Sequence, residues 1–438
     1  MKFRSRSLAA LAALLLLLTT AIPLSLAGAN GPATLVVDDD GEATATDCKA
    51  VGMAFDSIQL AVDAASPGDI IKVCPGTYNE SVTVGKFVRL RGAQAGVFAE
   101  RCGDRGPEST VTNGDDGAFR LEADRIVLNG FRIANNTGPG ITTSADFSGY
   151  HIRSNKIENN AGGLDLASAG PIRSYINRNC FDDNNVGLGN GGIAGDGIAS
   201  ERFTRNVNIN NNGFRSHANN ALDLTESGEA SPTSRNVSIV RNTSIDNARL
   251  IRIDDARGIL LLANRASGSG QSDRAQVLIG DDDGATAINL IGNRIAVADA
   301  DDAILIGSDG DDVLVYSNIL SDASDDGIDV LAETPGAVVV RNNRVTNTGD
   351  NGIELGDSAA QNHIVLNVAS GSADLDCRDE STGEDTAGTA NNWRANTGAT
   401  SDPPGLCRPP AATATASGAR ASGGDASVDH PGEDDWQP

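Results

Sequence analysis

Two stretches with one pattern decide the fold: Val315-Tyr316-Ser317-Asn318-Ile319-Leu320 and Val340-Arg341-Asn342-Asn343-Arg344-Val345. Each has apolar residues at alternating positions, then an Asn, then another apolar residue. Copies of the pattern recur from residue 126 to about residue 370. Their shared Asn positions are Asn129, Asn155, Asn179, Asn212, Asn242, Asn264, Asn293, Asn318, Asn343 and Asn367. Alternation indicates short strands with one buried face, and a repeat of about two dozen residues predicts stacked coils of three strands.

The repeated Asn has a structural interpretation. One coil cannot close a core, so stacking must supply it. At a bend between two strands, an Asn amide would reach the Asn of the next coil, about 4.8 Å away, and Asn tolerates a left-handed backbone. Contact with a ligand is the alternative. We favour the structural Asn ladder.

These repeats resemble the right-handed parallel β-helix repeat family, the broad group around pectate lyases. The resemblance covers residues 126–370 and implies an all-β, single-stranded right-handed solenoid of about ten or more coils. Residues 55–69 read as a capping helix and a turn, and residues 70–78 as a strand, an order similar to the N-terminal start of pectin esterase-like proteins. Residues 377–407, which contain Trp393, resemble the C-terminal closure of secreted bacterial members.

The chain opens like an export signal, with Lys2, Arg4 and Arg6 before an apolar run over residues 8–18. A membrane anchor is the alternative, but the run is short for a span. We therefore predict a secreted, extracellular monomer without a membrane segment after signal removal. The predicted regions are the signal peptide 1–27, the N-terminal cap and first coils 28–125, the repeats 126–376, the C-terminal cap 377–407 and a disordered tail 408–438.

The six cysteines form no Cys-x-x-Cys pair, which favours disulfides over a metal or redox motif. Cys377 and Cys407 stand alone near the C-terminal end, so they are the first expected pair. Cys48 with Cys74 is the second, which leaves Cys102 for Cys180. Sequence alone leaves the connectivity open.

The net charge of −25 becomes −28 once Lys2, Arg4 and Arg6 are removed with the signal. A polyanion such as nucleic acid would be repelled, so we exclude it as a partner. Cations are better candidates. A solvated acidic surface explains the same charge.

Acidic residues occupy one place in three successive coils, namely Asp301, Asp302, Asp325, Asp326 and Asp350. Stacked carboxylates repel, so either they point into water or Ca²⁺ lies between them. A loop with Asp309, Asp311 and Asp312 resembles a single calcium-binding nonapeptide. Ca²⁺ is thus the one cofactor that the sequence points to.

No complete catalytic motif is present, so whether the protein is an enzyme stays open. His151, His217 and His363 lie in separate coils and are expected at the surface or at strand edges. The basic residue of a β-helix lyase is matched in type only, and no base is assigned among Arg249, Arg252, Arg257, Arg341 and Arg344. The resemblance implies a protein that binds or processes an extracellular polysaccharide, with lyase activity as one form of processing. The alternative is a non-catalytic structural or surface scaffold.

Overall fold

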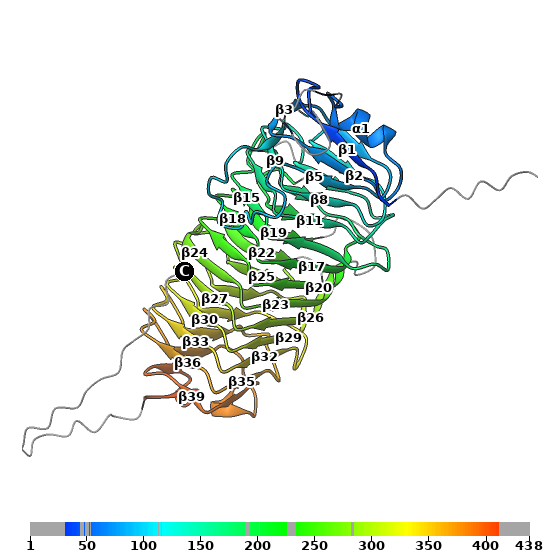
Figure 1. Cartoon of the computed structure of the whole chain (residues 1–438). Coiled ribbons are helices and arrows are strands. Elements are labelled where there is room, and N and C mark those ends of the chain that lie inside the picture. The colour runs from blue at the N-terminus through cyan, green and yellow to red at the C-terminus, as the bar shows by residue number, and fades with distance from the viewer. Residues whose placement is uncertain are drawn as a thin grey trace, which may run out of the picture.

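The computed structural model describes residues 31–410, except 44–47, 49–51, 53, 113, 115, 189–192, 201, 226–233 and 282–283. The predicted signal peptide and all but the first residues of the predicted tail lie outside this part. Parallel strands of the described residues form three sheets of 14, 13 and 14 strands. Figure 1 shows the coils stacked along one long axis, with the N-terminal strands at one end and the C-terminal strands at the other.

Each coil contributes one strand to each sheet, and we name the sheets by the order in which a coil visits them. Sheet A contains β1 (Thr34–Val37), β2 (Ile70–Val73), β5 (Arg89–Arg91), β8 (Val127–Asn129), β11 (His151–Arg153), β14 (Ser174–Asn177), β17 (Arg205–Asn210), β20 (Ser234–Val240), β23 (Ala256–Leu262), β26 (Ala285–Ile291), β29 (Gly310–Tyr316), β32 (Val338–Arg341), β35 (His363–Val365) and β38 (Asn392–Arg394).

Sheet B follows the bend that carries the repeated Asn. Its strands are β3 (Gly76–Asn79), β6 (Ser109–Thr112), β9 (Arg132–Ala134), β12 (Lys156–Glu158), β15 (Cys180–Asp182), β18 (Gly213–Arg215), β21 (Thr243–Ile245), β24 (Arg265–Ser269), β27 (Arg294–Ala298), β30 (Ile319–Ser321), β33 (Arg344–Thr346), β36 (Val368–Ser370), β39 (Asn396–Thr397) and β41 (Cys407–Arg408).

Sheet C completes each coil. Its strands are β4 (Val82–Val84), β7 (Phe119–Leu121), β10 (Ile141–Thr143), β13 (Leu164–Asp165), β16 (Ile198–Ala199), β19 (Asn220–Leu224), β22 (Arg249–Ile253), β25 (Val277–Ile279), β28 (Ile304–Ile306), β31 (Ile328–Val330), β34 (Ile353–Leu355), β37 (Cys377–Asp379) and β40 (Ser401–Asp402).

The core is a set of aliphatic columns inside the coils. Ile259, Ile288, Val313 and Val338 are paired in register along sheet A and are at most 2% exposed. Every second residue of a strand faces inward, so the period-2 pattern of the sequence becomes one continuous apolar interior. The prediction of an all-β parallel solenoid is confirmed.

The Asn ladder runs through this stack at the bend between sheets A and B. From Asn155 to Asn367, each Nδ2 donates to the Oδ1 of the next coil's Asn at 3.0–3.1 Å. Asn396, which the sequence pattern missed, accepts the last of these bonds. Each Nδ2 also donates to a carbonyl oxygen of the preceding coil, as Asn293 does to Leu261 at 3.1 Å.

Asn129 belongs to a coil but is not a member of the ladder, so its assignment to the repeated Asn position was wrong. It pairs in register with Arg153, two positions before Asn155. The ladder position of its coil belongs to Phe131, whose N–H donates to Asn155 Oδ1 at 3.0 Å. Asn129 Oδ1 instead accepts the N–H of Gly96 at 3.2 Å. The stretch at residues 126–131 has the same residue types as the other copies, which explains the misplacement.

The left-handed backbone at this bend belongs to the residue before each ladder Asn. These residues have φ between 52° and 62°, and they are Ser154, Arg178, Asn211, Arg241, Ala263, Gly292, Ser317, Asn342, Leu366 and Ala395. Gly292 is the one glycine among them. The ladder Asn residues are therefore selected for their amides, because the strained conformation lies one position earlier.

Relief of this strain is measurable at Ala263, which has φ 55°. We expect Ala263→Gly to raise the free energy of unfolding by about 0.5 kcal/mol, because the lost left-handed strain exceeds the added chain entropy of the unfolded state. Ala266→Gly, inside β24, is the control and should destabilise. Urea denaturation checks both, and a loss of stability in Ala263→Gly would contradict the strain argument.

A second, shorter amide ladder lies at the bend that follows sheet B. Asn136 donates to Asn160 and Asn160 to Asn184, at 2.7 and 2.9 Å. His217 continues this column, and its Nδ1 lies 2.8 Å from Oδ1 of Asn247. His217 is 2% exposed, so its expected surface position was wrong, and burial lowers its pKa to about 4. It is neutral at pH 7 and acts as part of the core.

The ends of the solenoid differ in construction. Helix α1 (Ile58–Ala64) is shorter than the predicted capping segment; Ser57 is its N-cap, and Ile58, Ala61 and Val62 are buried against the first strands. Trp393 is 5% exposed inside β38, in the last coils, where Nε1 donates to Asp379 at 2.7 Å. Within the described residues, no helix is long and apolar enough to cross a membrane.

Three disulfides join Cys48 to Cys74, Cys102 to Cys180 and Cys377 to Cys407. The third pair links β37 of sheet C to β41 of sheet B and closes the C-terminal end, as expected. The second pair attaches the long connection between β5 and β6 to β15 in the side of the stack. All six cysteines are used, which fits the disulfide framework inferred from their spacing.

Candidate functional site on sheet C

The acidic residues of the repeats form a column at the bend before sheet C. The N–H of Asp325 donates to the carbonyl oxygen of Asp301, and the N–H of Asp350 to that of Asp325, both at 3.0 Å. Asp374 adds a fourth coil, because its N–H donates to the carbonyl oxygen of Asp350 at 3.0 Å. Arg274 occupies the same place one coil earlier, because the N–H of Asp301 donates to the carbonyl oxygen of Arg274 at 3.2 Å. We call Asp301, Asp325, Asp350 and Asp374 the acidic column.

Carboxylate oxygens of Asp325, Asp326 and Asp350 converge, all within 4.8 Å of one another. Oxygens that bind one Ca²⁺ at about 2.3–2.6 Å lie no more than roughly 5 Å apart. These three carboxylates therefore have the spacing of a partial Ca²⁺ site. Asp325 and Asp350 are partly exposed, so solvent reaches the point where the oxygens meet.

The second Asp of each pair is buried. Asp302 is 4% and Asp326 is 5% exposed. Each accepts one backbone N–H from the next coil, Asp302 from Asp326 at 3.0 Å and Asp326 from Asn351 at 2.6 Å. Burial, together with neighbouring carboxylates, raises the pKa of Asp302 to about 8 and that of Asp326 to about 9.

Two further carboxylates border this group from the outward face of sheet C. Asp329 and Glu354 are neighbours in register, and Arg378 follows Glu354. Burial and then the charge of Glu354 raise the pKa of Asp329 to about 7. Asn351 is fully buried, and its Nδ2 donates to Glu354 and, at 3.1 Å, to Asp350. We call Asp302, Asp326, Asp329 and Glu354 the carboxylate group; the first two are buried and the other two are partly buried. The sequence did not single out Asp329 and Glu354, because strand alternation alone does not show which side chains the stacked coils bring together.

Some polar atoms of this group lack a hydrogen-bond partner. Within the described part of the chain, Oδ1 of Asn351 and Oδ1 of Asp329 are buried without one. Buried acceptors of this kind usually bind water or an ion. The four carboxyls and the amide thus form a set of oxygen atoms that is incompletely satisfied by the protein.

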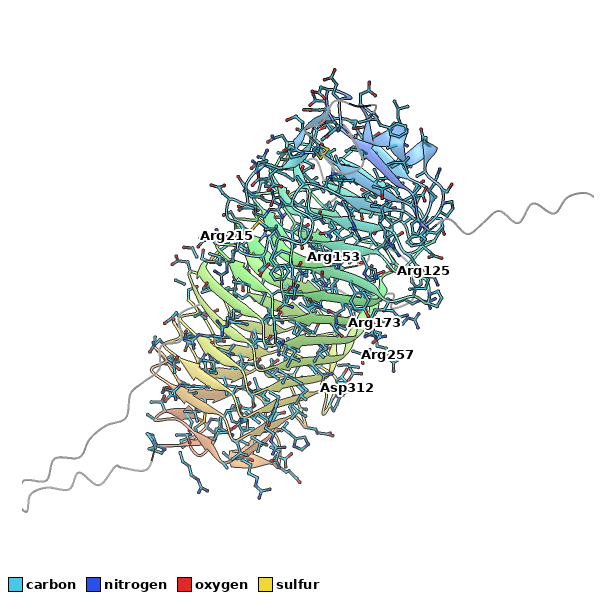
Figure 2. The ribbon with its side chains drawn as sticks, in the orientation of Figure 1. Arg125, Arg153, Arg173, Arg215, Arg257 and Asp312 are labelled. Atoms are coloured by element: carbon cyan, nitrogen blue, oxygen red, sulfur yellow. A yellow bond between two sulfur atoms is a disulfide. The ribbon has the colours of Figure 1, made fainter. Side chains whose placement is uncertain are left out.

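Asp309, Asp311 and Asp312 lie elsewhere. Asp309 precedes β29, and Asp311 and Asp312 are exposed residues of β29, at the bend between sheets C and A. Figure 2 shows Asp312 at the same edge as Arg257. Among the described residues, these three aspartates form no converging set of carboxylates. The structure does not bring the two predicted acidic sites together.

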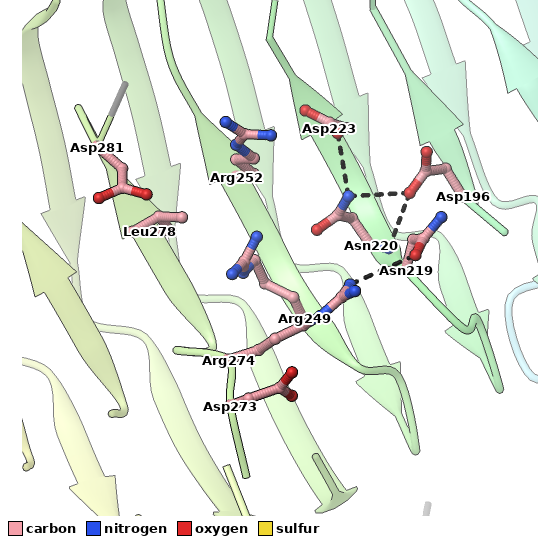
Figure 3. A pocket seen from close by; sticks show the side chains of 10 residues that line it. All are labelled: Asp196, Asn219, Asn220, Asp223, Arg249, Arg252, Asp273, Arg274, Leu278 and Asp281. Carbon is pink, nitrogen blue, oxygen red and sulfur yellow. Dashed lines mark hydrogen bonds between the residues drawn. The ribbon is translucent and has the colours of Figure 1, made fainter. Parts of the chain in front are cut away.

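A polar pocket of about 450 Å³ adjoins the acidic column on the N-terminal side (Figure 3). Arg249, Arg252 and Arg274 lie in its middle, and nine of its ten lining residues are polar or charged. The others are Asp196, Asn219, Asn220, Asp223, Asp273, Leu278 and Asp281. We call it the arginine pocket. Its size lies within the range of small-ligand sites.

Comparisons with known proteins give one family match, within the solenoid, and three solved structures of low sequence identity. A family model described as "Right handed beta helix region" matches residues 233–369. Pectate lyase Pel9A has 14% sequence identity and a TM-score of 0.40, with 84% of this chain and 80% of that chain covered. The catalytic unit of a thermostable GH87 alpha-1,3-glucanase from Streptomyces thermodiastaticus strain HF3-3 has 14% identity and a TM-score of 0.43, with 85% and 70% covered.

A third solved structure, ORF18 of Geobacillus virus E2, has 15% identity and a TM-score of 0.25, with 83% of this chain and 60% of that chain covered. No curated protein matches the chain. The family match covers six of the ten residues that line the arginine pocket, and it covers Asp301, Asp325 and Asp350 of the acidic column. Taken with the parallel strand register, it identifies the fold of this chain as a right-handed parallel β-helix.

Proposed function

We propose that this is an extracellular protein that binds a polysaccharide along the bend before sheet C, with Ca²⁺ held by Asp325, Asp326 and Asp350. The observation that carries the proposal is the convergence of these carboxylate oxygens within 4.8 Å, on stacked coils. Asp302, Asp329 and Glu354 border the same point. Because Ca²⁺ prefers oxygen ligands and keeps open positions, a saccharide oxygen could complete its coordination.

The composition of the surface supports a saccharide ligand. Next to the carboxylates, the arginine pocket offers guanidinium donors and carboxylate and amide acceptors, with Leu278 as its one apolar residue. Hydroxyl groups both donate and accept hydrogen bonds, so they suit such a mixed lining better than an apolar ligand does. The stacked coils extend this polar surface along the axis, which suits a polymer.

A panel of polysaccharides tests the proposal. The full secreted chain is mixed with uronic-acid polymers and neutral glucans, with Ca²⁺ or with EDTA, and both binding and ultraviolet absorbance of unsaturated products are followed. We expect binding that is strengthened by Ca²⁺. Product formation that stops in EDTA would add lyase chemistry. If no polymer binds in either condition, the polysaccharide proposal is wrong and a scaffold role replaces it.

A further inference from the structure

The arginine pocket brings three arginines together among four aspartates, on a strongly acidic protein. Arg249 and Arg252 lie on β22, and Arg274 precedes β25 in the next coil. Figure 3 shows the side chain of Arg274 passing that of Arg249 and ending at Asn219, and the charge of Arg274 acts on Arg249. With a net charge of −25 for the whole chain, an acidic polymer would approach only where such local positive charge is exposed.

Two of these arginines have no carboxylate partner among the described residues. Arg249 Nε donates to the carbonyl oxygen of Ala275 at 2.9 Å, and Arg274 Nη1 makes a long 3.4 Å contact with Asn219 Oδ1. Within the described residues, neither forms an ion pair. Both are half-buried rather than extended into water. Their remaining N–H donors are therefore available to a ligand.

Two of the four aspartates that line the pocket accept hydrogen bonds from other side chains, and the other two are exposed. Asp196 accepts the N–H and Nδ2 of Asn220 at 2.8 and 2.9 Å. Asp223 accepts Nδ2 of Asn220 at 3.0 Å and the hydroxyl of Thr225. Asp273 and Asp281 are exposed. None of these four is paired with Arg249 or Arg274 in the described structure.

The proximity of the guanidinium groups is unfavourable without an anion. Burial, followed by the charges of Arg274 and Arg252, lowers the pKa of Arg249 to about 10. Arg249 is still protonated at neutral pH, so the like charges repel, and the charges of Asp223 and Asp254 offset this repulsion only in part. An anionic group between the two guanidiniums would relieve this repulsion, and the planar fork of Arg matches a carboxylate or sulfate in a bidentate manner.

One neighbouring atom points to a saccharide rather than a simple ion. Oδ1 of Asn220 lines the same pocket, is buried, and has no hydrogen-bond partner among the described residues. Asn220 is the register neighbour of Arg249 on the preceding coil. A hydroxyl donor next to an acidic group would satisfy this acceptor after a small side-chain shift, and acidic sugar units carry both.

We infer that Arg249 and Arg274 form a subsite for an acidic sugar unit, whose carboxylate or sulfate ester lies between the two guanidiniums. This inference rests on the proposed polysaccharide binding and gives that ligand a chemical class. Arg252, already paired with Asp254 at 2.6 Å, supplies further positive charge at the edge of the subsite.

The test uses the full chain in EDTA, so that Ca²⁺ makes no contribution. Binding to polygalacturonate, dextran sulfate and unmodified dextran is measured for the wild type, Arg249→Gln and Arg274→Gln. We expect tighter binding of at least one acidic polymer than of dextran, and a loss of about 10-fold or more in each variant. The preferred polymer distinguishes a carboxylate from a sulfate ester. Arg257→Gln, an exposed residue of β23, is the control for net charge and should bind like the wild type.

Inorganic sulfate is a second probe that needs no polymer. A rise in melting temperature in the wild type and Arg257→Gln, but not in the two pocket variants, supports the subsite even if no polymer binds. Equal binding of acidic and neutral polymers, unchanged in both variants, overturns the subsite and leaves polysaccharide binding intact. Absence of polymer binding together with an identical response to sulfate in all four proteins overturns both. Arg274 precedes its strand and has one long contact, so Arg274→Gln should fold even if Arg249→Gln does not.

Discussion

Asn293→Ala is expected to lower the free energy of unfolding by about 4 kcal/mol or more. The substitution removes four hydrogen bonds of the ladder. Nδ2 of Asn293 donates to Leu261 and Asn318, and its Oδ1 accepts from the backbone N–H and Nδ2 of Asn264. The partners stay buried at this bend, so their lost bonds are not replaced by water, and each unsatisfied group costs about 1–3 kcal/mol.

Asn289→Ala is the matched control, because Asn289 lies in the same coil on the outward side of β26. Its side chain makes no hydrogen bond to a described residue, and its loss should cost less than about 1 kcal/mol. Urea denaturation of both variants gives the comparison. Equal and small losses would show that the ladder amides do not stabilise the stack.

Stability should fall as pH rises from 6.5 to 9 when divalent cations are removed with EDTA. The folded-state pKa values of Asp302, Asp326 and Asp329 are about 8, 9 and 7, all above the ordinary value of 3.8. The folded protein therefore binds more protons than the unfolded chain in this window. The stabilisation is present at low pH and is lost as pH rises through these values, which we expect to cost about 2 kcal/mol or more.

Asp326→Asn should reduce this pH dependence and make the protein more stable than the wild type at pH 9. An amide keeps an oxygen to accept the N–H of Asn351 but cannot ionise. Starting at pH 6.5 limits the contribution of His151 and His217, whose lowered pKa values give the opposite slope at more acidic pH. Asp311→Asn, on an exposed position of β29, is the control. A wild-type stability that is flat or rises over this range would contradict the buried protonated carboxylates.

The sequence predicted the solenoid because its period is carried by many copies of one pattern. Alternating apolar residues such as Val313 and Val315 require an interior, and the Asn after them marks the bend between sheets A and B. The same reasoning failed at Asn129, where residue type matched but register did not. It also failed at His217, since a histidine in an Asn column has no sequence signal of its own.

The candidate site was predictable only in part. The acidic column follows from spacing, because Asp301, Asp325 and Asp350 recur at the period of the coils. Asp329 and Glu354 could not be assigned, because their role depends on the burial that the neighbouring coils impose. The arginine pocket joins Arg249 to Arg274, two residues that belong to different positions of the repeat and share no motif. Such a pocket arises from loop length and side-chain packing rather than from the period.

Calcium titration of the full chain at pH 8 tests the central claim most directly. Calorimetry is carried out on EDTA-treated and dialysed wild type, Asp326→Asn and Asp311→Asn. Metal binding must displace the proton from Asp326, whose folded-state pKa is about 9, so affinity should rise with pH. The account predicts a saturable Ca²⁺ site in the wild type and Asp311→Asn that is weakened or lost in Asp326→Asn. No binding heat and no change in melting temperature with Ca²⁺ or EDTA, or equal binding in all three proteins, would contradict it.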